Sequence, residues 1–272
     1  MTANSRFVDV GRARMHVSEA GSGEPLVFLH AGIADGRMWA PQQDAFAASR
    51  RTLAIDRRGF GRTIYEAEPF SHVDDLIAVL DALGIERTVL VGCSMGGRLA
   101  IDTALVHPQR VRAVALVGTA VSGAPRPEVF PAAIQARFDA LEAAEQAELI
   151  DEVNEIEAQL WLDGPEQPAG RVSGPLRDLF LAMNDIALHA APVGSETLLP
   201  PAWPRLHTLA LPSLVVWGLL DFPHLLERMR HIVATVPGAR SHVVANTAHL
   251  PNLERPDEFN AVLAHFLELL DR

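Results

Sequence analysis

A serine flanked by glycines is the part of this sequence best suited to chemistry. The run Gly92-Cys93-Ser94-Met95-Gly96 follows the apolar residues 89–91 and precedes a helical pattern that continues to Val106. This spacing predicts that a strand turns sharply into a helix with Ser94 at the apex, because the glycines leave room where the backbones crowd. The N-terminus of the helix would offer free N–H groups to developing negative charge. We therefore predict that Ser94 is a nucleophile.

Two residues further along the chain could activate this serine. A serine hydroxyl is a weak nucleophile that needs an adjacent base, and a third group must orient that base. His249 lies in a loop after the last predicted strand, and Asp221 follows the strand predicted at residues 214–217. The chain order serine, acid, histidine is typical of proteins with such a turn. We predict that Ser94, His249 and Asp221 act as nucleophile, base and orienting acid; the alternative is that the last two are ordinary loop residues.

Backbone N–H groups could stabilise the oxyanion that forms when Ser94 attacks a carbonyl. One predicted donor is the N–H of Met95, the residue after the nucleophile. The other should come from the loop His30-Ala31-Gly32-Ile33, which follows a predicted strand. We favour Gly32 over Ile33 because a glycine lets the backbone approach the substrate closely.

Other polar residues near Ser94 have simpler explanations. Cys93 is expected to be a small buried residue rather than a reactive thiol, because neighbouring side chains in a tight turn point in different directions. Arg98 is expected to face solvent or to form an ion pair, with a substrate carboxylate as the alternative partner. Asp56 leads into Arg57-Arg58-Gly59-Phe60-Gly61, which we expect to be a structural turn.

The elements that must position these residues alternate along the chain. Apolar runs predict eight strands, the first two of which alternate in polarity and form an antiparallel hairpin at a sheet edge. Helical patterns lie between the later strands, and a closing helix begins at about Pro256. We predict an α/β fold with a mostly parallel eight-stranded sheet and helices on both faces. The strands are expected at residues 7–10, 14–18, 25–30, 52–56, 89–91, 111–117, 213–217 and 241–244.

One long gap breaks this alternation. Almost a hundred residues separate two consecutive strands, whereas a crossover needs about a dozen or two. The gap holds two apolar stripes at helical spacing, one at residues 149–160 and the other at residues 176–186. We predict a helical cap at residues 119–204 over the carboxyl ends of the strands, and a core domain formed by residues 1–118 and 205–272. The expected pocket residues are His30, Trp161, Phe180, Met183 and Leu250.

Composition limits the class of protein. The net charge of −11 argues against nucleic-acid and anionic-membrane partners, and 49% hydrophobic residues are ordinary for a globular chain. The single cysteine cannot form an internal disulfide, and no signal peptide or transmembrane stretch is evident. We expect a cytoplasmic monomer or homodimer that acts on a small-molecule substrate. No spacing suggests a metal site or a phosphate-binding loop, so no metal or cofactor is expected.

Over nearly its whole length the chain resembles an α/β-hydrolase-fold serine hydrolase. Within that group it is similar to the small, single-capped esterases, enol-lactonases and carbon–carbon bond hydrolases. Many members have His-Gly where this chain has His30-Ala31-Gly32, which affects the second oxyanion donor. Ser94 argues against epoxide hydrolases and haloalkane dehalogenases, which have aspartate at the apex. The features that carry the resemblance are Leu29-His30-Ala31-Gly32, Asp56-Arg57-Arg58-Gly59-Phe60-Gly61, the turn at Ser94, Gly218-Leu219-Leu220-Asp221 and Ala248-His249.

This resemblance implies hydrolysis through an acyl-enzyme on Ser94. We expect the substrate to be a carboxylic ester or lactone of a small, fairly apolar molecule, because the cap carries apolar residues. One alternative is hydrolysis of a carbon–carbon bond in a diketone-type acid by the same three residues. Another is a ligand-binding or sensor protein of this fold without turnover. Peroxide-dependent halogenation or perhydrolysis is also compatible with the fold.

Overall fold

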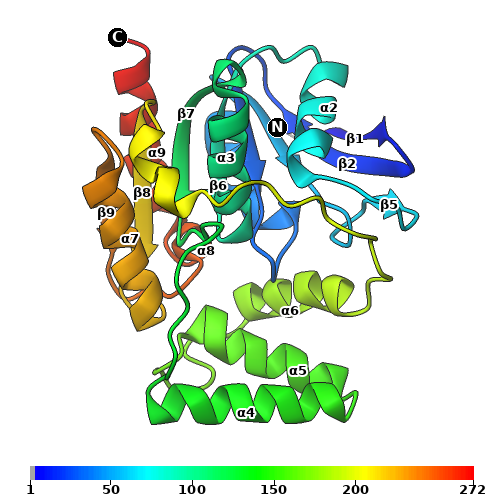
Figure 1. The fold of residues 1–272 in the computed structure, drawn as a ribbon, viewed down its shortest axis with the longest axis vertical. Coiled ribbons are helices and arrows are strands. Elements are labelled where there is room, and N and C mark those ends of the chain that lie inside the picture. Colours follow the sequence, from blue (N-terminus) through cyan, green and yellow to red (C-terminus); the bar gives the residue numbers. More distant parts are fainter. Residues whose placement is uncertain (1–3) are drawn as a thin grey trace.

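A single twisted sheet forms the centre of the molecule (Figure 1). The computed structural model describes residues 4–272, so the first three residues of the predicted core domain lie outside it. The strands follow the order β1-β2-β4-β3-β6-β7-β8-β9, and β5 pairs with β2 beside this path. β2 is antiparallel to β1, β4 and β5, and all other pairs are parallel. The strands are β1 (Asn4–Val10), β2 (Ala13–Ala20), β3 (Pro25–Leu29), β4 (Arg51–Ile55), β5 (Ile64–Tyr65), β6 (Thr88–Cys93), β7 (Val111–Val117), β8 (Ser213–Gly218) and β9 (Arg240–Val244).

The apolar composition of each strand follows from how deeply the strand is buried in the sheet. All six residues of β6 and of β8 are buried, because helices cover both faces of the parallel sheet. β1 and β9 lie at the two edges of the sheet and are mostly exposed or half-buried. The eight predicted strands are all present. β5 was not predicted, because two residues are too short to show a periodic pattern.

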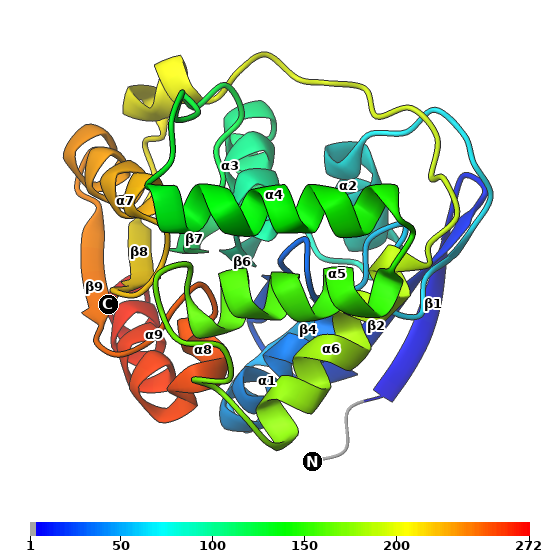
Figure 2. The ribbon, with the colours of Figure 1, turned by 90° about the horizontal axis from the view of Figure 1, so that it is seen from below.

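Helices pack on the two faces of the sheet, and Figure 2 shows the two groups on opposite sides. One core cluster joins the sheet to α2, α3 and α7, and a second joins it to α1, α8 and α9. None of these helices is long and apolar enough to cross a membrane, and the same holds for every other helix in residues 4–272. Their bounds are α1 (Ala40–Phe46), α2 (His72–Ala82), α3 (Met95–Val106), α7 (Pro223–Thr235), α8 (Pro251–Glu254) and α9 (Pro256–Leu270).

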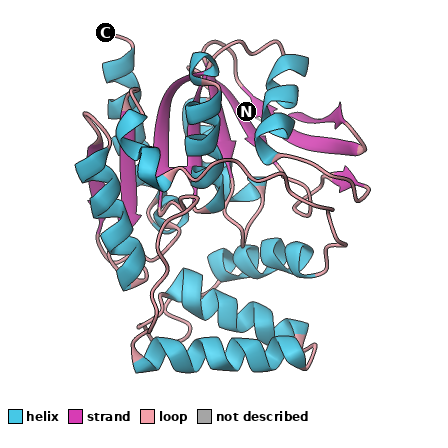
Figure 3. Cartoon of the chain, in the orientation of Figure 1, coloured by secondary structure: helices cyan, strands magenta, loops and turns pink. Residues whose placement is uncertain are grey.

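Three α-helices lie between β7 and β8 in sequence and form a separate layer beyond one end of the strands (Figure 3). They are α4 (Ala132–Gln146), α5 (Ile150–Glu157) and α6 (Pro175–Leu188), and α5 continues into a π-helical turn at Ala158–Asp163. α5 and α6 coincide with the two predicted apolar stripes. α4 was not predicted, because only Ile134 and Ala144 are buried in this alanine-rich helix and no clear stripe results.

The helical layer is tied to the sheet by both apolar and polar contacts. Phe180 and Met183 of α6 are fully buried in the core cluster that also contains Ile33 and Leu250. The Arg37 guanidinium donates to the carbonyl of Ala182 at 3.1 Å. These contacts bury Phe180 and Met183 and attach the helical layer to the core, whereas Ile186 on the same helix stays exposed.

Candidate active site

Ser94 occupies a strained turn between β6 and α3. Its backbone angles are φ 51° and ψ −113°, in the left-handed region that non-glycine residues rarely adopt. The Ser94 N–H donates to the carbonyl of Val117 at 2.9 Å, which fixes the turn against β7. A Cβ on Gly96 would overlap the carbonyl oxygen of Leu29, and one on Gly92 would overlap the backbone of Gly96. The glycines predicted from the sequence are therefore required by close backbone packing.

His249 and Asp221 form a buried pair. The distance between His249 Nδ1 and Asp221 Oδ2 is 2.7 Å, and each side chain is 1% exposed. The other carboxylate oxygen, Oδ1, accepts the N–H of Phe222 at 2.8 Å. Because an ionised carboxylate only accepts hydrogen bonds, the imidazole proton belongs on Nδ1 and the lone pair on Nε2. His249 Nε2 is buried and has no hydrogen-bond partner in residues 4–272, so it is free to accept a proton.

Neighbouring loops hold the imidazole in place. The N–H of His249 donates to the carbonyl of Trp161 at 3.2 Å, and the centroids of the two rings lie 4.7 Å apart. The N–H of Leu220 donates to the carbonyl of Thr247 at 2.9 Å, which joins the acid-bearing loop to the histidine-bearing loop. A Cβ on Gly118 would lie 3.1 Å from His249 Nδ1. The π-helical turn of the inserted layer thus contributes directly to the position of the histidine.

The loop at residues 30–33 lies against the residue that follows Ser94. A Cβ on Gly32 would lie 2.6 Å from the sulfur atom of Met95, so the Met95 side chain packs directly against this glycine. Ile33 is buried, and its side chain belongs to the core cluster beneath the loop. The two segments predicted to supply the oxyanion donors are therefore neighbours.

A cavity of about 510 Å³ opens beside Ser94. Trp161, one of the expected pocket residues, is among the residues that line it. His30, Phe180, Met183 and Leu250, which we expected in the pocket, are instead fully buried and are not among its lining residues. Phe180 and Met183 are buried because the apolar face of α6 packs onto the core, in the same cluster as Leu250. His30 is held instead by hydrogen bonds in the strand-end loop. The walls are formed by Ser94, Gly118, Ala120, Arg126, Pro127, Phe130, Gln135, Phe138, Trp161, His224, Leu225 and Arg228.

Several of these lining residues were missed by sequence reasoning. Phe130 and Phe138 come from α4 and the segment before it, and their rings lie 4.8 Å apart. His224, Leu225 and Arg228 come from the first turns of α7. The residues of α7 could have been predicted from their place in the sequence. This helix begins two residues after Asp221, so its first turns must lie at the same edge of the sheet.

His30 has a structural role in the strand-end loop. Its Nδ1 donates to the carbonyl of Ala31 at 2.7 Å, and its Nε2 accepts the N–H of Arg57 at 3.1 Å. Burial, with the nearby charge of Arg57, lowers the pKa of His30 to about 3. The ring is therefore neutral at physiological pH and fixes the start of the loop at residues 30–33.

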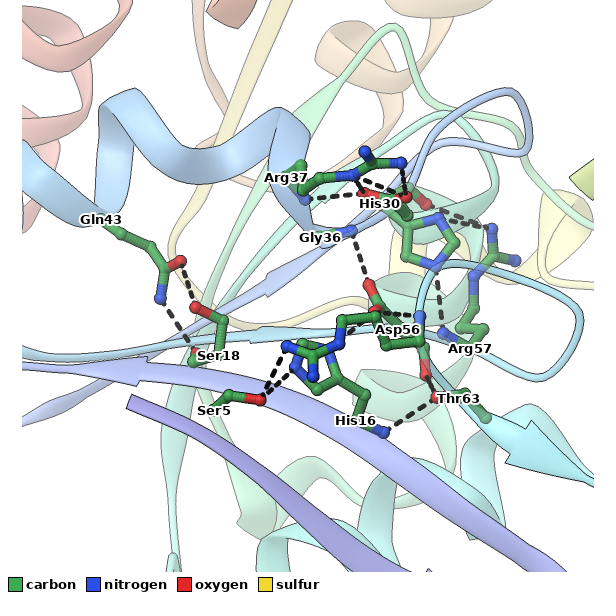
Figure 4. A network of polar contacts seen from close by, with 12 residues as sticks. Ser5, His16, Ser18, His30, Gly36, Arg37, Gln43, Asp56, Arg57 and Thr63 are labelled. Atoms are coloured by element: carbon green, nitrogen blue, oxygen red, sulfur yellow. Dashed lines mark hydrogen bonds and ion pairs between the residues drawn. The ribbon is translucent and has the colours of Figure 1, made fainter. Parts of the chain in front are cut away.

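Asp56 is the centre of a polar network, shown in Figure 4. Its carboxylate accepts the N–H groups of Gly36 and Arg62 at 2.7 and 2.9 Å, and its Oδ2 lies 2.7 Å from His16 Nδ1. A Cβ on Gly61 would overlap this carboxylate. The segment after β4 is thus the structural turn expected from its charges and glycines.

The remaining residues near Ser94 also have structural partners. Cys93 is fully buried and its thiol donates to the carbonyl of His249 at 3.7 Å. Burial raises the pKa of this thiol, so it stays protonated. Arg98 pairs with Asp102 on its own helix and with Glu196. Both outcomes agree with the simpler explanations.

Comparison with known proteins places the chain in a family. It is 30% identical to a 2-hydroxy-6-oxononadienedioate/2-hydroxy-6-oxononatrienedioate hydrolase of Paraburkholderia phymatum, over 97% of this chain and 96% of that protein. It is 28% identical to a 2-hydroxy-6-oxo-6-phenylhexa-2,4-dienoate hydrolase of Comamonas testosteroni, over 95% and 93% of the two chains.

Solved structures and a family-wide comparison agree with this fold. The structure of Est816, described as an N-acyl homoserine lactone degrading enzyme, superposes with a TM-score of 0.71 at 27% identity, over 96% of this chain and 99% of that one. An esterase from Exiguobacterium antarcticum superposes with a TM-score of 0.77 at 20% identity, over 97% and 100% of the two chains. The alpha/beta hydrolase family matches residues 26–262. The chain therefore belongs to the alpha/beta hydrolase family.

Proposed function

We propose that this protein is a serine hydrolase that breaks a carbon–carbon bond in a small diketone-type acid. The observation that carries the proposal is the buried His249–Asp221 pair, with a free Nε2, at the edge of the sheet where Ser94 lines a cavity. The names of the relatives that match nearly the whole chain favour this substrate class over the ester that the sequence alone suggests.

The proposed reaction proceeds through an ester on Ser94, with His249 as the group that accepts and returns the proton. Ser94 Oγ attacks a carbonyl while His249 Nε2 accepts its proton, and the N–H groups of Met95 and Gly32 stabilise the oxyanion. The carbon–carbon bond then breaks, and a second carbonyl in the leaving group delocalises the electron pair. His249 protonates the leaving group, and water hydrolyses the ester on Ser94 by the same route. Asp221 keeps the imidazole in the required tautomer and stabilises its charged form.

The charged wall of the cavity supports an acidic substrate. Arg228 lines the cavity, and its only protein hydrogen bond in residues 4–272 is a long one, 3.5 Å, to the carbonyl of Pro125. Burial, with a smaller effect from the charge of Arg126, lowers the pKa of Arg228, although the charge of Asp221 acts in the opposite direction. Neither arginine has a carboxylate within ion-pair distance in the described part of the chain, whereas Arg98, Arg171 and Arg177 are all paired. A substrate carboxylate would offset the cost of burying the Arg228 charge, and the exposed Arg126 adds a second positive charge to the same wall.

A carboxylic ester or lactone is the second candidate substrate. The rings of Phe130, Phe138 and Trp161 give the cavity apolar walls, which suit a neutral acyl chain. The likeness to Est816, at 27% identity, favours a lactone among these. The same nucleophile, base and acid would serve, with an oxygen rather than a carbon as leaving atom.

Product analysis on paired substrates separates the two candidates. Wild type and Ser94→Ala are assayed with 2-hydroxy-6-oxo-6-phenylhexa-2,4-dienoate and with p-nitrophenyl butyrate. The proposal predicts release of benzoate from the dienoate with a kcat/KM at least about tenfold above that for the ester, and loss of both activities in Ser94→Ala. Faster cleavage of the ester would favour the second candidate. Failure of folded wild type to turn over either compound would contradict both.

A further inference from the structure

We propose that Ser5 is a second nucleophile, activated by His16 and Asp56, which takes up an acyl group from small activated acyl donors. Ser5 Oγ lies 2.8 Å from His16 Nε2, and His16 Nδ1 lies 2.7 Å from Asp56 Oδ2. The order of hydroxyl, imidazole and carboxylate, and the ring nitrogen that each contacts, are those of an activated serine. Figure 4 shows Ser5 and Asp56 on opposite sides of the His16 ring.

The carboxylate fixes the proton on the imidazole. Burial alone would favour neutral Asp56, but the hydrogen bond from His16, together with the N–H groups of Arg62 and Gly36, lowers the pKa of this carboxyl. Asp56 is therefore ionised at neutral pH and accepts the proton of His16 Nδ1. In the neutral ring Nε2 is then the acceptor, so the Ser5 hydroxyl donates to it.

The base is rigidly held while the serine remains accessible. The N–H of His16 donates to Thr63 Oγ1 at 2.9 Å, and that hydroxyl donates to the carbonyl of Asp56 at 2.6 Å. The Phe7 ring lies 5.4 Å from the His16 ring and covers it from β1. His16 is 7% exposed, whereas Ser5 is exposed near the start of the edge strand. A small acyl donor can therefore reach the hydroxyl without displacing the imidazole.

A cavity and a cation complete the site. Ser5, His16 and Asp56 line a cavity of about 410 Å³ that shares no lining residue with the cavity beside Ser94. Arg62 also lines it, and its guanidinium donates to Ser5 Oγ at 3.1 Å. Arg62 forms no ion pair with a carboxylate within residues 4–272, so its charge is available to the negative oxygen that forms at Ser5.

The step balances without any further reactant. Ser5 Oγ forms a bond to the acyl carbon, and the hydroxyl proton passes to His16 Nε2. The carbonyl oxygen carries the negative charge beside Arg62 until the bond to the leaving oxygen breaks. The leaving oxygen then takes the proton from His16. The products are an ester on Ser5 and a free alcohol, phenol or acid.

The test uses the full-length Ser94→Ala variant, so its outcome is independent of the function proposed for Ser94. The variant is treated with p-nitrophenyl acetate, and nitrophenolate release, intact mass and peptide maps are followed. The chain suits this probe, because all 23 of its Lys and Arg residues are arginines and no lysine amine competes. We expect one acetyl group per chain, located on Ser5, with a matching burst of nitrophenolate.

Two further variants in the same background test how Ser5 is activated. Ser5→Ala should abolish the adduct, and His16→Gln should slow its formation by about 10² or more. Ser18→Ala is the matched control, because Ser18 lines the same cavity but donates to Gln43 instead of a histidine. It should leave the rate unchanged. Absence of an adduct on folded protein, an adduct at another residue, or equal rates in Ser94→Ala with and without His16→Gln would overturn the proposal.

Discussion

At the scale of single residues, the proposed chemistry depends on polar side chains that have no hydrogen-bond or ion-pair partner within the described residues. His249 Nε2 is buried without a partner, while the opposite nitrogen is 2.7 Å from Asp221. Two arginines, Arg126 and Arg228, line the cavity beside Ser94, and neither has a carboxylate at ion-pair distance in residues 4–272. A base without a partner and a cavity wall that carries unpaired cations are the features that a nucleophilic attack on an acid would use.

Arg228→Met should change selectivity between acidic and neutral substrates. With p-nitrophenyl hexanoate and mono-p-nitrophenyl adipate, which differ in a terminal carboxylate, the variant should lose about tenfold in kcat/KM for the adipate alone. The loss should fall mainly on KM, because the charge contacts the substrate away from the reacting carbonyl. The control is Arg230→Met, an exposed position on the same helix that does not line the cavity. An equal loss for both substrates would contradict a carboxylate contact.

At the scale of elements, the helical layer both covers and builds the site. The π-helical turn places the carbonyl and ring of Trp161 against His249, and such turns are often found at functional sites. α6 has a different task, because Phe180 and Met183 are fully buried against the core. Their apolar spacing predicted the helix, but spacing alone could not tell whether its apolar face met the substrate or the loops beneath.

Phe180→Ala should act on stability rather than on substrate binding. Removal of this fully buried ring should lower the free energy of unfolding by about 3–5 kcal/mol. Leu198→Ala, at a position 72% exposed, should change it by less than about 0.5 kcal/mol. Urea unfolding at fixed pH measures both. A small change in the free energy of unfolding of Phe180→Ala, accompanied by a raised KM, would instead indicate that Phe180 contacts the substrate.

At the scale of the whole molecule, the sequence predicted the sheet better than the cavity. Parallel strands are continuous apolar runs and the first hairpin alternates in polarity, so all eight of the longer strands were recognisable. The cavity walls were not, because Phe130, Phe138 and Arg228 come from separate segments whose meeting depends on how the inserted layer packs. The Ser94 turn and its partners were recognisable because each follows a strand end, and parallel strands end at one edge.

Global stability should fall as the pH is lowered below neutral, partly through His72. Burial, with the charge of Arg57, lowers the pKa of His72 to about 3. Between pH 6.5 and pH 3 the unfolded chain binds a proton at this residue and the folded chain does not, so stability rises with pH in this window. The free energy of unfolding of wild type relative to His72→Asn should therefore fall by about 1.4 kcal/mol per pH unit below pH 6. A difference that stays constant from pH 7 to pH 5 would contradict this.

The most direct test of the proposed function is covalent labelling by a fluorophosphonate, followed by intact mass and peptide mapping. Wild type, Ser94→Ala and His249→Ala are compared under the same conditions, with folding checked by circular dichroism. We predict an adduct on the Ser94 peptide of wild type that is absent from both variants; any label on the Ser5 peptide is read separately. An unlabelled Ser94 peptide in folded wild type, or undiminished labelling of Ser94 in His249→Ala, would contradict the assignment of Ser94 as a nucleophile activated by His249.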